Sequence, residues 1–228
     1  MDLSVLEKTI DTEFKNRDFL KEALTHRSYL NENPGWRIPH NERLEFLGDA
    51  VLELAVTKNL FARFPDYPEG QLTSLRASLV NSQTMARAAK TISLDDYLLL
   101  SRGESKDMGK ARDVILANAM EALIGALYLD SGYGSAEILI EKFIINPYLD
   151  EIIKNGLYKD PKSQIQEIAQ EKFKLTPIYQ VMGEEGPDHK KTFKMGVYFG
   201  EKLIAEGEGY SKQDAEIEAA RNALKDLI

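Results

Sequence analysis

Hydrophobic residues recur at three- and four-residue spacing through the first two thirds of the chain. The spacing is clear in "DFLKEALTHRSYL", "RLEFLGDAVLELAVTKNLF", "QLTSLRASLVNSQTMARAAK" and "RDVILANAMEALIGALYL", and it is typical of amphipathic helices. Turn-rich segments separate these runs, namely "NENPGWRIPHN", "FPDYPEG" and "DSGYG". Residues 1–154 are therefore predicted to form one all-α domain.

The pattern changes after the polar connector "KNGLYKD". Asp160 and Pro161 predict the N-cap and first residue of a helix. Alternating residues in "TFKMGVYFGEKL" then predict a half-buried strand, and "PIYQVMGEEG" and "LIAEGEG" predict one strand on each side. Ser211 and Asp214 resemble a capping box before a last helix with predicted inward residues Ala215, Ala219, Ala220, Ala223 and Leu224. Residues 160–228 thus predict a small α+β module of order α-β-β-β-α.

The helix predicted from "NERLEFLGDAVLEL" carries an unusual stripe of acids on one side. With about 3.6 residues per turn, one narrow face collects Glu42, Glu45, Asp49 and Glu53. No lysine or arginine is interleaved on that side, so the like charges repel. The opposite side is expected to hold Leu44, Leu47, Val51 and Leu54.

Gly48, in the middle of this helix, costs roughly 1 kcal/mol relative to alanine, and such a glycine indicates close approach by another backbone or a ligand. Two interpretations remain open on the residues alone: a solvated acidic face, or a metal site.

A later apolar helix carries a second polar pair. Asn118 and Glu121 stand three residues apart in "ILANAMEALIGALYLDSG". If the two helices pack together, oxygen ligands alone would converge from Glu45, Asp49, Asn118 and Glu121. Such ligands suit Mg²⁺ or Mn²⁺ rather than zinc. With no Ser-His or Cys-His pair to act as a nucleophile, they point to metal-assisted phosphodiester chemistry.

At these residues the chain resembles a known family. "NERLEFLGDAVL" is similar to the signature of ribonuclease III, the double-stranded-RNA endonuclease family, and "ALTHRSYLNE", "EGQLTSLRASLV" and "EALIGALYLDSGY" support the match. The C-terminal module resembles a double-stranded-RNA-binding domain through "IQEIAQEKF", "EEGPDHKKTF" and "EGYSKQDAEIEAA". The resemblance covers essentially the whole chain.

The resemblance implies roles for the acids. Glu45, Asp49, Glu121 and the position of Asn118 match metal ligands, whereas Glu42 and Glu69 match outer acids that shape the site and contact the substrate. It also implies a homodimer and Mg²⁺-dependent hydrolysis of duplex RNA, with Mn²⁺ as a substitute. The products carry 5′-phosphate and 3′-hydroxyl ends, and the expected role is processing of ribosomal and messenger RNA.

One departure from the family concerns position 118, where aspartate is usual and this chain has Asn118. An amide oxygen can coordinate a hard cation, but the site loses one formal negative charge, so weaker metal binding is expected. Either the asparagine still supports catalysis, or it marks a weakened or inactive enzyme that only binds duplex RNA.

The resemblance also implies three RNA-contacting regions. These are Ser163, Gln166 and Glu167 on the first helix, Pro187, Asp188 and His189 in a loop, and Ser211, Lys212 and Gln213 at the last helix. The helix residues would reach one minor groove, the loop the next, and Lys212 the phosphates between them. Gln213 replaces a usual lysine, so one phosphate contact is lost. Without the resemblance, the helix residues would be plain surface, His189 a turn residue, and the lysines at 190, 191 and 194 protection for an edge strand.

Composition adds limits. The 228 residues carry a net charge of −8, which argues mildly against a nucleic-acid partner. The charge is unevenly distributed: residues 1–155 hold 18 Lys+Arg and 24 Asp+Glu, and the remaining residues hold 11 and 13.

The chain has no cysteine, which fits a reducing cytoplasm. No signal peptide and no apolar run of about 18 residues is evident, so a cytoplasmic protein without a membrane span is expected. His26 and His40 are expected to be structural or capping residues, and Trp36 to pack locally.

Overall fold

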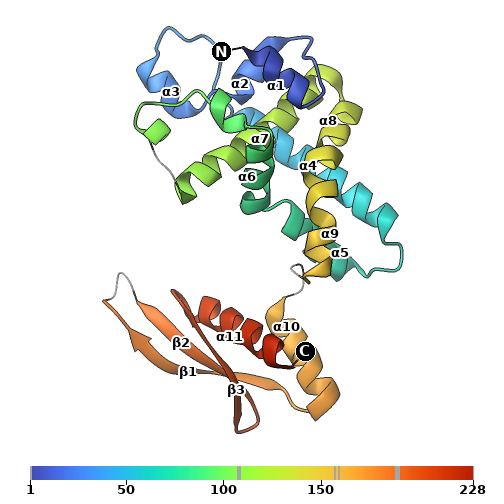
Figure 1. Ribbon diagram of the computed structural model, residues 1–228, viewed down its shortest axis with the longest axis vertical. Coiled ribbons are helices and arrows are strands. Elements are labelled where there is room, and N and C mark those ends of the chain that lie inside the picture. Colours follow the sequence, from blue (N-terminus) through green and yellow to red (C-terminus); the bar gives the residue numbers. More distant parts are fainter. Residues whose placement is uncertain (1, 107–108, 157, 159, 188–190, 228) are drawn as a thin grey trace. The chain divides into compact units, whose positions relative to one another are not determined.

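The computed structural model describes residues 2–106, 109–156, 158, 160–187 and 191–227. It divides the chain into two compact units, Met1–Tyr158 and Lys159–Ile228 (Figure 1). Each unit has its own hydrophobic cluster. The first is helical and the second contains a sheet, in agreement with the predicted fold class.

The first unit contains helices of α, 3₁₀ and π type. Its elements are α1 (Leu3–Thr9), α2 (Arg17–Ala23), α3 (Arg27–Glu32), α4 (Glu42–Arg63), α5 (Glu69–Leu79), α6 (Ser82–Thr91), η1 (Leu94–Tyr97), η2 (Glu104–Lys106), α7 (Lys110–Ser131), α8 (Tyr133–Ile140), η3 (Glu141–Ile145) and α9 (Asn146–Lys154). The central helix is α7, which packs against α2, α4, α6 and α8. By length and composition alone α7 could cross a membrane, but 56% of its most apolar window is buried inside the unit.

Two of the predicted helical runs are each broken into two helices. Between α2 and α3, Thr25 forms a parallel bridge with Leu99, and the backbone N–H of His26 donates to the Leu99 carbonyl at 3.0 Å. A continuous helix would use these backbone groups internally, so the bridge ends α2. Between α5 and α6, the Asn81 side chain accepts a hydrogen bond from the Thr84 N–H at 2.9 Å, which begins a new helix.

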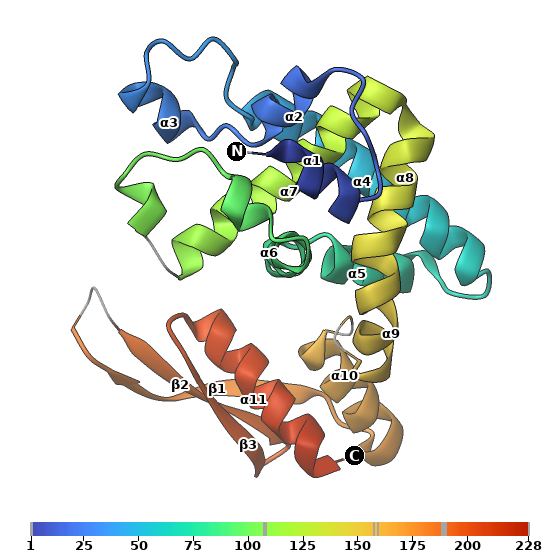
Figure 2. The ribbon, with the colours of Figure 1, turned by 45° about the horizontal axis from the view of Figure 1, so that its top comes forward.

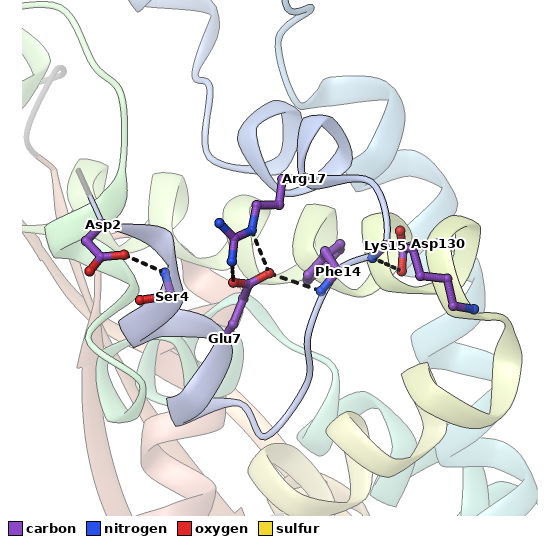
Figure 3. A network of polar contacts seen from close by, with 7 residues as sticks. All are labelled: Asp2, Ser4, Glu7, Phe14, Lys15, Arg17 and Asp130. Carbon is purple, nitrogen blue, oxygen red and sulfur yellow. Dashed lines mark hydrogen bonds and ion pairs between the residues drawn. The ribbon is translucent and has the colours of Figure 1, made fainter.

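A buried carboxylate holds the N-terminal segment together (Figure 3). Glu7 is only 5% exposed, and its oxygens accept from the Arg17 guanidinium at 2.6 Å and the Phe14 N–H at 3.0 Å. Farther along the same loop, the backbone N–H groups of Lys15 and Asn16 donate to Asp130 at 3.1 and 2.8 Å. The loop is thereby fixed to the C-terminal end of α7.

The second unit is a three-stranded antiparallel sheet with helices on one face. Its elements are α10 (Pro161–Ile168), η4 (Ala169–Phe173), β1 (Pro177–Glu185), β2 (Thr192–Phe199), β3 (Lys202–Gly209) and α11 (Lys212–Leu227), and the strand order is β1-β2-β3. Figure 2 shows α11 lying along the sheet. The central position of β2 makes edge protection the wrong explanation for Lys194.

The core of this unit matches the sequence pattern. Met195, Val197 and Phe199 are buried on β2, and four alanines are buried on α11 (Ala215, Ala219, Ala220 and Ala223). Val197 and Phe199 form one cluster with the last three of these alanines. Both predicted helix starts are confirmed. The Asp160 side chain accepts from the Ser163 N–H at 2.9 Å, and the Ser211 hydroxyl accepts from the Asp214 N–H at 3.1 Å.

Candidate metal centre and nucleic-acid interface

The acidic helix α4 crosses α7 at two glycines. A Cβ atom added to Gly48 would lie 1.8 Å from the Glu121 carbonyl oxygen, and one added to Gly125 would lie 2.2 Å from that of Leu44. Only glycines permit this approach, because real Cβ contacts are never so short. The predicted close approach at Gly48 is therefore confirmed, and its neighbour is the backbone of the second polar helix.

This crossing places the acids of α4 beside the polar pair of α7. Burial raises the pKa of Glu121 to about 7, with further contributions from the charges of Asp49 and Glu45. Burial also raises the pKa of Glu45, and the negative charges of Glu42 and Asp49 add to the effect. Asn118 opposes that rise because its side chain hydrogen-bonds to the Glu45 carboxylate. The four predicted ligands thus lie within electrostatic reach of one another.

The donor set fits a hard divalent cation. It offers carboxylate and amide oxygens only, and Glu121 is half-buried, so a nearby cation would stabilise its ionised form. Among the described residues, no three His, Cys, Asp or Glu groups are arranged as a ready-made metal site. The fourth predicted ligand, Asn118, is an amide and is not one of these residue types.

The outer acids of the prediction are arranged differently. Glu42 lies 3.4 Å from Arg27 and 3.8 Å from the Nδ1 atom of His40, so the Arg27 guanidinium, from outside α4, partly neutralises the stripe. Glu69 begins α5, and its carboxylate accepts from the Thr73 hydroxyl at 2.9 Å. It lines a pocket with Thr57 and Phe61 of α4, which lie about two and three turns beyond Asp49. The structure therefore does not bring Glu69 to the other acids within one chain.

The prediction of which residues of α4 face inward is wrong at one position. Leu44 and Val51 are buried, but Leu54 is 58% exposed. It shares an outer face with Phe46, which is 82% exposed, and Phe61, which is 73% exposed. A helix of this length can have two apolar faces, and periodicity alone cannot tell which of them the domain covers.

Of the residues expected to have structural roles, His26 and Trp36 have them, whereas the buried Nδ1 atom of His40 has no hydrogen-bond partner among the described residues. His26 is the N-cap of α3, where its Nδ1 atom accepts from the Ser28 N–H at 3.3 Å. Trp36 packs edge-on against Tyr29, with ring centroids 5.6 Å apart. A positioning residue that the sequence did not reveal is Asn41. Its side chain donates to the Ala23 carbonyl at 3.2 Å and ties the start of α4 to α2.

The predicted RNA-contacting residues of the second unit are mostly exposed. Ser163, Gln166 and Glu167 line an open groove along α10, although the Ser163 hydroxyl also donates to Asp160 at 2.8 Å. Pro187, Lys212 and Gln213 are exposed. Asp188 and His189 lie outside the described residues.

Two charged residues beside this surface were not singled out in the sequence. Lys162, on the first turn of α10, contacts Glu216 of α11 at 2.6 Å. Glu184, at the end of β1, contacts Lys191 at 2.5 Å and Lys212 at 3.7 Å. Pairing across separate elements has no short-range signal in the sequence.

The half-buried Glu121 makes the stability of the metal-free protein depend on pH. Its pKa is about 7 in the folded protein and its ordinary value is 4.5, so the folded state holds an extra proton between these values. The stabilisation is complete below about pH 4.5 and is lost as the pH rises through about 7. We expect the urea midpoint of the metal-free protein to contain a contribution that falls as the pH rises from about 4.5 to about 7. The Glu121→Gln variant should lack this contribution. Parallel pH profiles for the two proteins would contradict the assignment.

Comparisons with known proteins show the family of each unit. A model of the ribonuclease-III-like family matches residues 16–148, and a model of the double-stranded RNA binding motif matches residues 161–227. Ribonuclease 3 of Syntrophobacter fumaroxidans is 43% identical over 227 residues, which cover 98% of this chain and 93% of that protein. Ribonuclease 3 of Geobacter metallireducens is 46% identical over 220 residues, which cover 96% and 89%.

A solved structure supports the same conclusion for the first unit. The nuclease domain of ribonuclease III from Campylobacter jejuni is 39% identical and superposes with a TM-score of 0.59, covering 64% of this chain and 99% of that one. This chain therefore belongs to the ribonuclease III family.

Proposed function

We propose that the protein cleaves double-stranded RNA by Mg²⁺-dependent hydrolysis, with Mn²⁺ as a substitute, in RNA processing in the cytoplasm. Residues 1–154 would form the catalytic domain and residues 160–228 the RNA-binding domain. The observation that carries the proposal is the crossing of α4 and α7 at Gly48 and Gly125, which sets Glu45, Asp49, Asn118 and Glu121 around one region. Cleavage would leave 5′-phosphate and 3′-hydroxyl ends.

The four side chains would hold the ion between the two helices. When bound, Mg²⁺ supplies Lewis-acid chemistry, which activates water and neutralises charge on the phosphate. Glu121 must release its proton to serve as a ligand, and its raised pKa sets the pH range in which it can. Glu42, held by Arg27, lies at the outer end of the stripe, where it orients substrate.

The test is an assay of duplex-RNA cleavage with Mg²⁺ and with Mn²⁺ at millimolar concentrations. We expect staggered cuts in both strands and no cutting of single strands. Protein that binds the duplex yet leaves it intact with either ion would contradict catalysis and would favour a role in binding alone.

We further propose that the protein acts as a homodimer through the outer face of α4. Phe46, Leu54 and Phe61 are large exposed apolar side chains on one side of α4, and exposed apolar patches mark interaction sites. The Campylobacter jejuni structure is described as showing flexibility in a region involved in dimer formation. Sedimentation equilibrium should show a dimer, and Phe46→Asp should give monomers.

A weakened enzyme is the second candidate, and Asn118 is the observation that favours it. The Asn118 amide hydrogen-bonds to Glu45 and lowers the pKa of its carboxyl group, whereas a carboxylate at this position would repel it. Asn118→Asp would replace this hydrogen bond by a fourth carboxylate, beside Glu45, Asp49 and Glu121. We expect tighter Mn²⁺ binding by about tenfold, roughly 1.4 kcal/mol, with lower stability of the metal-free protein.

Isothermal titration with Mn²⁺ measures the affinity, and the cleavage rate of the same variant decides between the candidates. A rate within a few-fold of the unsubstituted protein at saturating ion shows that asparagine supports catalysis. A rise of several orders of magnitude shows that the natural site is impaired. Unchanged Mn²⁺ affinity would contradict the placement of residue 118 in the site.

A further inference from the structure

A carboxylate is placed among the cations of the proposed RNA-binding surface. Glu184 contacts Lys191 at 2.5 Å and Lys212 at 3.7 Å. Both lysine ammonium groups also lie 5.7 Å from the centre of the Phe193 ring. Lys191 directly precedes β2 in the chain, and Lys212 is the first residue of α11. Glu184 therefore bridges two separate elements.

The strand register explains why this carboxylate faces the lysines. Glu184 is paired directly with Phe193 across β1 and β2, and paired residues point to the same face of a sheet. Lys194 follows Phe193 in the strand, and successive side chains point to opposite faces, so Lys194 points to the other face. There it forms its own ion pair with Glu206 at 2.6 Å. The sheet thus carries two similar ion pairs on its two faces, and only one includes a proposed RNA contact.

We propose that Glu184 competes with RNA phosphates for Lys191 and Lys212, and so limits the affinity of this chain for duplex RNA. The inference rests on the proposed function, because it requires Lys212 to grip phosphate. A phosphate that approaches Lys212 must displace a carboxylate already within ion-pair distance. The two lysines also lower the pKa of the Glu184 carboxyl group, Lys191 most strongly.

The competition has a consequence for salt dependence. When RNA takes the two lysines, Glu184 loses its partners and attracts cations from the solution. This uptake offsets part of the counterion release that drives binding to nucleic acids. Removing the charge of Glu184 should therefore tighten binding and also steepen its dependence on salt. A residue that only supported the fold would not change the salt slope.

The experiment compares Glu184→Gln with Glu206→Gln in the full-length protein. Both variants remove one negative charge. Glu184 has two lysine partners and Glu206 has one, on the other face of the sheet. The probe is a blunt RNA duplex of about 20 base pairs, longer than the roughly 16 that such a module spans, with EDTA present to prevent cleavage. Affinity is measured between roughly 50 and 200 mM salt, and thermal unfolding verifies that both variants fold.

We expect Glu184→Gln to bind the duplex roughly 2- to 10-fold more tightly than Glu206→Gln at low salt, because each exposed ion pair is worth a factor of about five at most. The slope of the logarithm of its binding constant against the logarithm of the salt concentration should be steeper by up to about one. With Lys191 and Lys212 both changed to glutamine, the difference between the two variants should vanish.

Equal affinities and slopes for the two variants, or weaker binding by Glu184→Gln, would overturn the inference about Glu184 while leaving RNA binding intact. If the unsubstituted protein fails to bind the duplex and Lys212→Gln changes nothing, the proposed RNA-binding role itself fails, and the inference fails with it.

Discussion

Glu121→Gln should reduce cleavage of duplex RNA by at least ~10³-fold, equivalent to about 4 kcal/mol of transition-state stabilisation. Glutamine keeps the size of the side chain and one oxygen, so the packing around α7 is preserved. It removes the charge of the most buried acid in the proposed site, whose pKa of about 7 reflects both burial and the nearby charges of Asp49 and Glu45. The loss should persist at saturating Mg²⁺.

The matched control for this prediction is Glu53→Gln. Glu53 is an exposed acid one turn beyond Asp49 on α4, so its substitution changes the net charge equally without touching the α4–α7 crossing. We expect its cleavage rate to stay within about twofold, as for ordinary surface changes. Single-turnover rates with both ions measure the effect. Comparable losses in the two variants would show that general charge, rather than the position of Glu121, controls activity.

Gly48→Ala should destabilise the first unit by about 3 kcal/mol or more, despite the better helix propensity of alanine. The new methyl group would meet the Glu121 carbonyl oxygen at 1.8 Å, with the Gly125 nitrogen at 2.9 Å. These are backbone atoms, which cannot rotate away, so α4 and α7 must separate. The separation would also pull Glu45 and Asp49 from Asn118 and Glu121, and cleavage should fall in the fraction that still folds.

The control for this prediction is Gly70→Ala on α5. A Cβ atom there meets nothing within 4 Å, and the backbone is helical, so we expect no loss and a gain of up to about 1 kcal/mol. Urea unfolding of both variants, followed by circular dichroism, measures the difference. A Gly48→Ala protein as stable as the Gly70→Ala protein would contradict the glycine-to-glycine crossing.

Much of the second unit follows from short-range signals. Asp160 with Pro161 and Ser211 with Asp214 mark helix starts that hydrogen bonds confirm. The alternation from Phe193 to Phe199 describes a strand that packs one face against helices. Each of these patterns depends on residues within a few positions of one another, and local backbone geometry is enough to read them.

Features that depend on distant segments could not be read in this way. The break between α2 and α3 arises from hydrogen bonds to Leu99, about 75 residues along the chain. The exposure of Leu54 depends on which face of α4 meets α7. The pairing of Glu184 with Lys212 depends on the sheet register and on where α11 begins. None of these partners is near in sequence, so no local pattern encodes them.

For this protein, the sequence alone determined which residue types could carry the chemistry: an acidic stripe on one helix, an Asn-Glu pair on another, and a module with the pattern of an RNA-binding domain. Only the tertiary structure decided that Gly48 and Gly125 allow the two helices to touch, that Arg27 neutralises Glu42, and that Glu69 lies apart from the other acids in one chain. The physical reason is that helix periodicity orders side chains around one axis, whereas the charge and burial of a site depend on which axes cross.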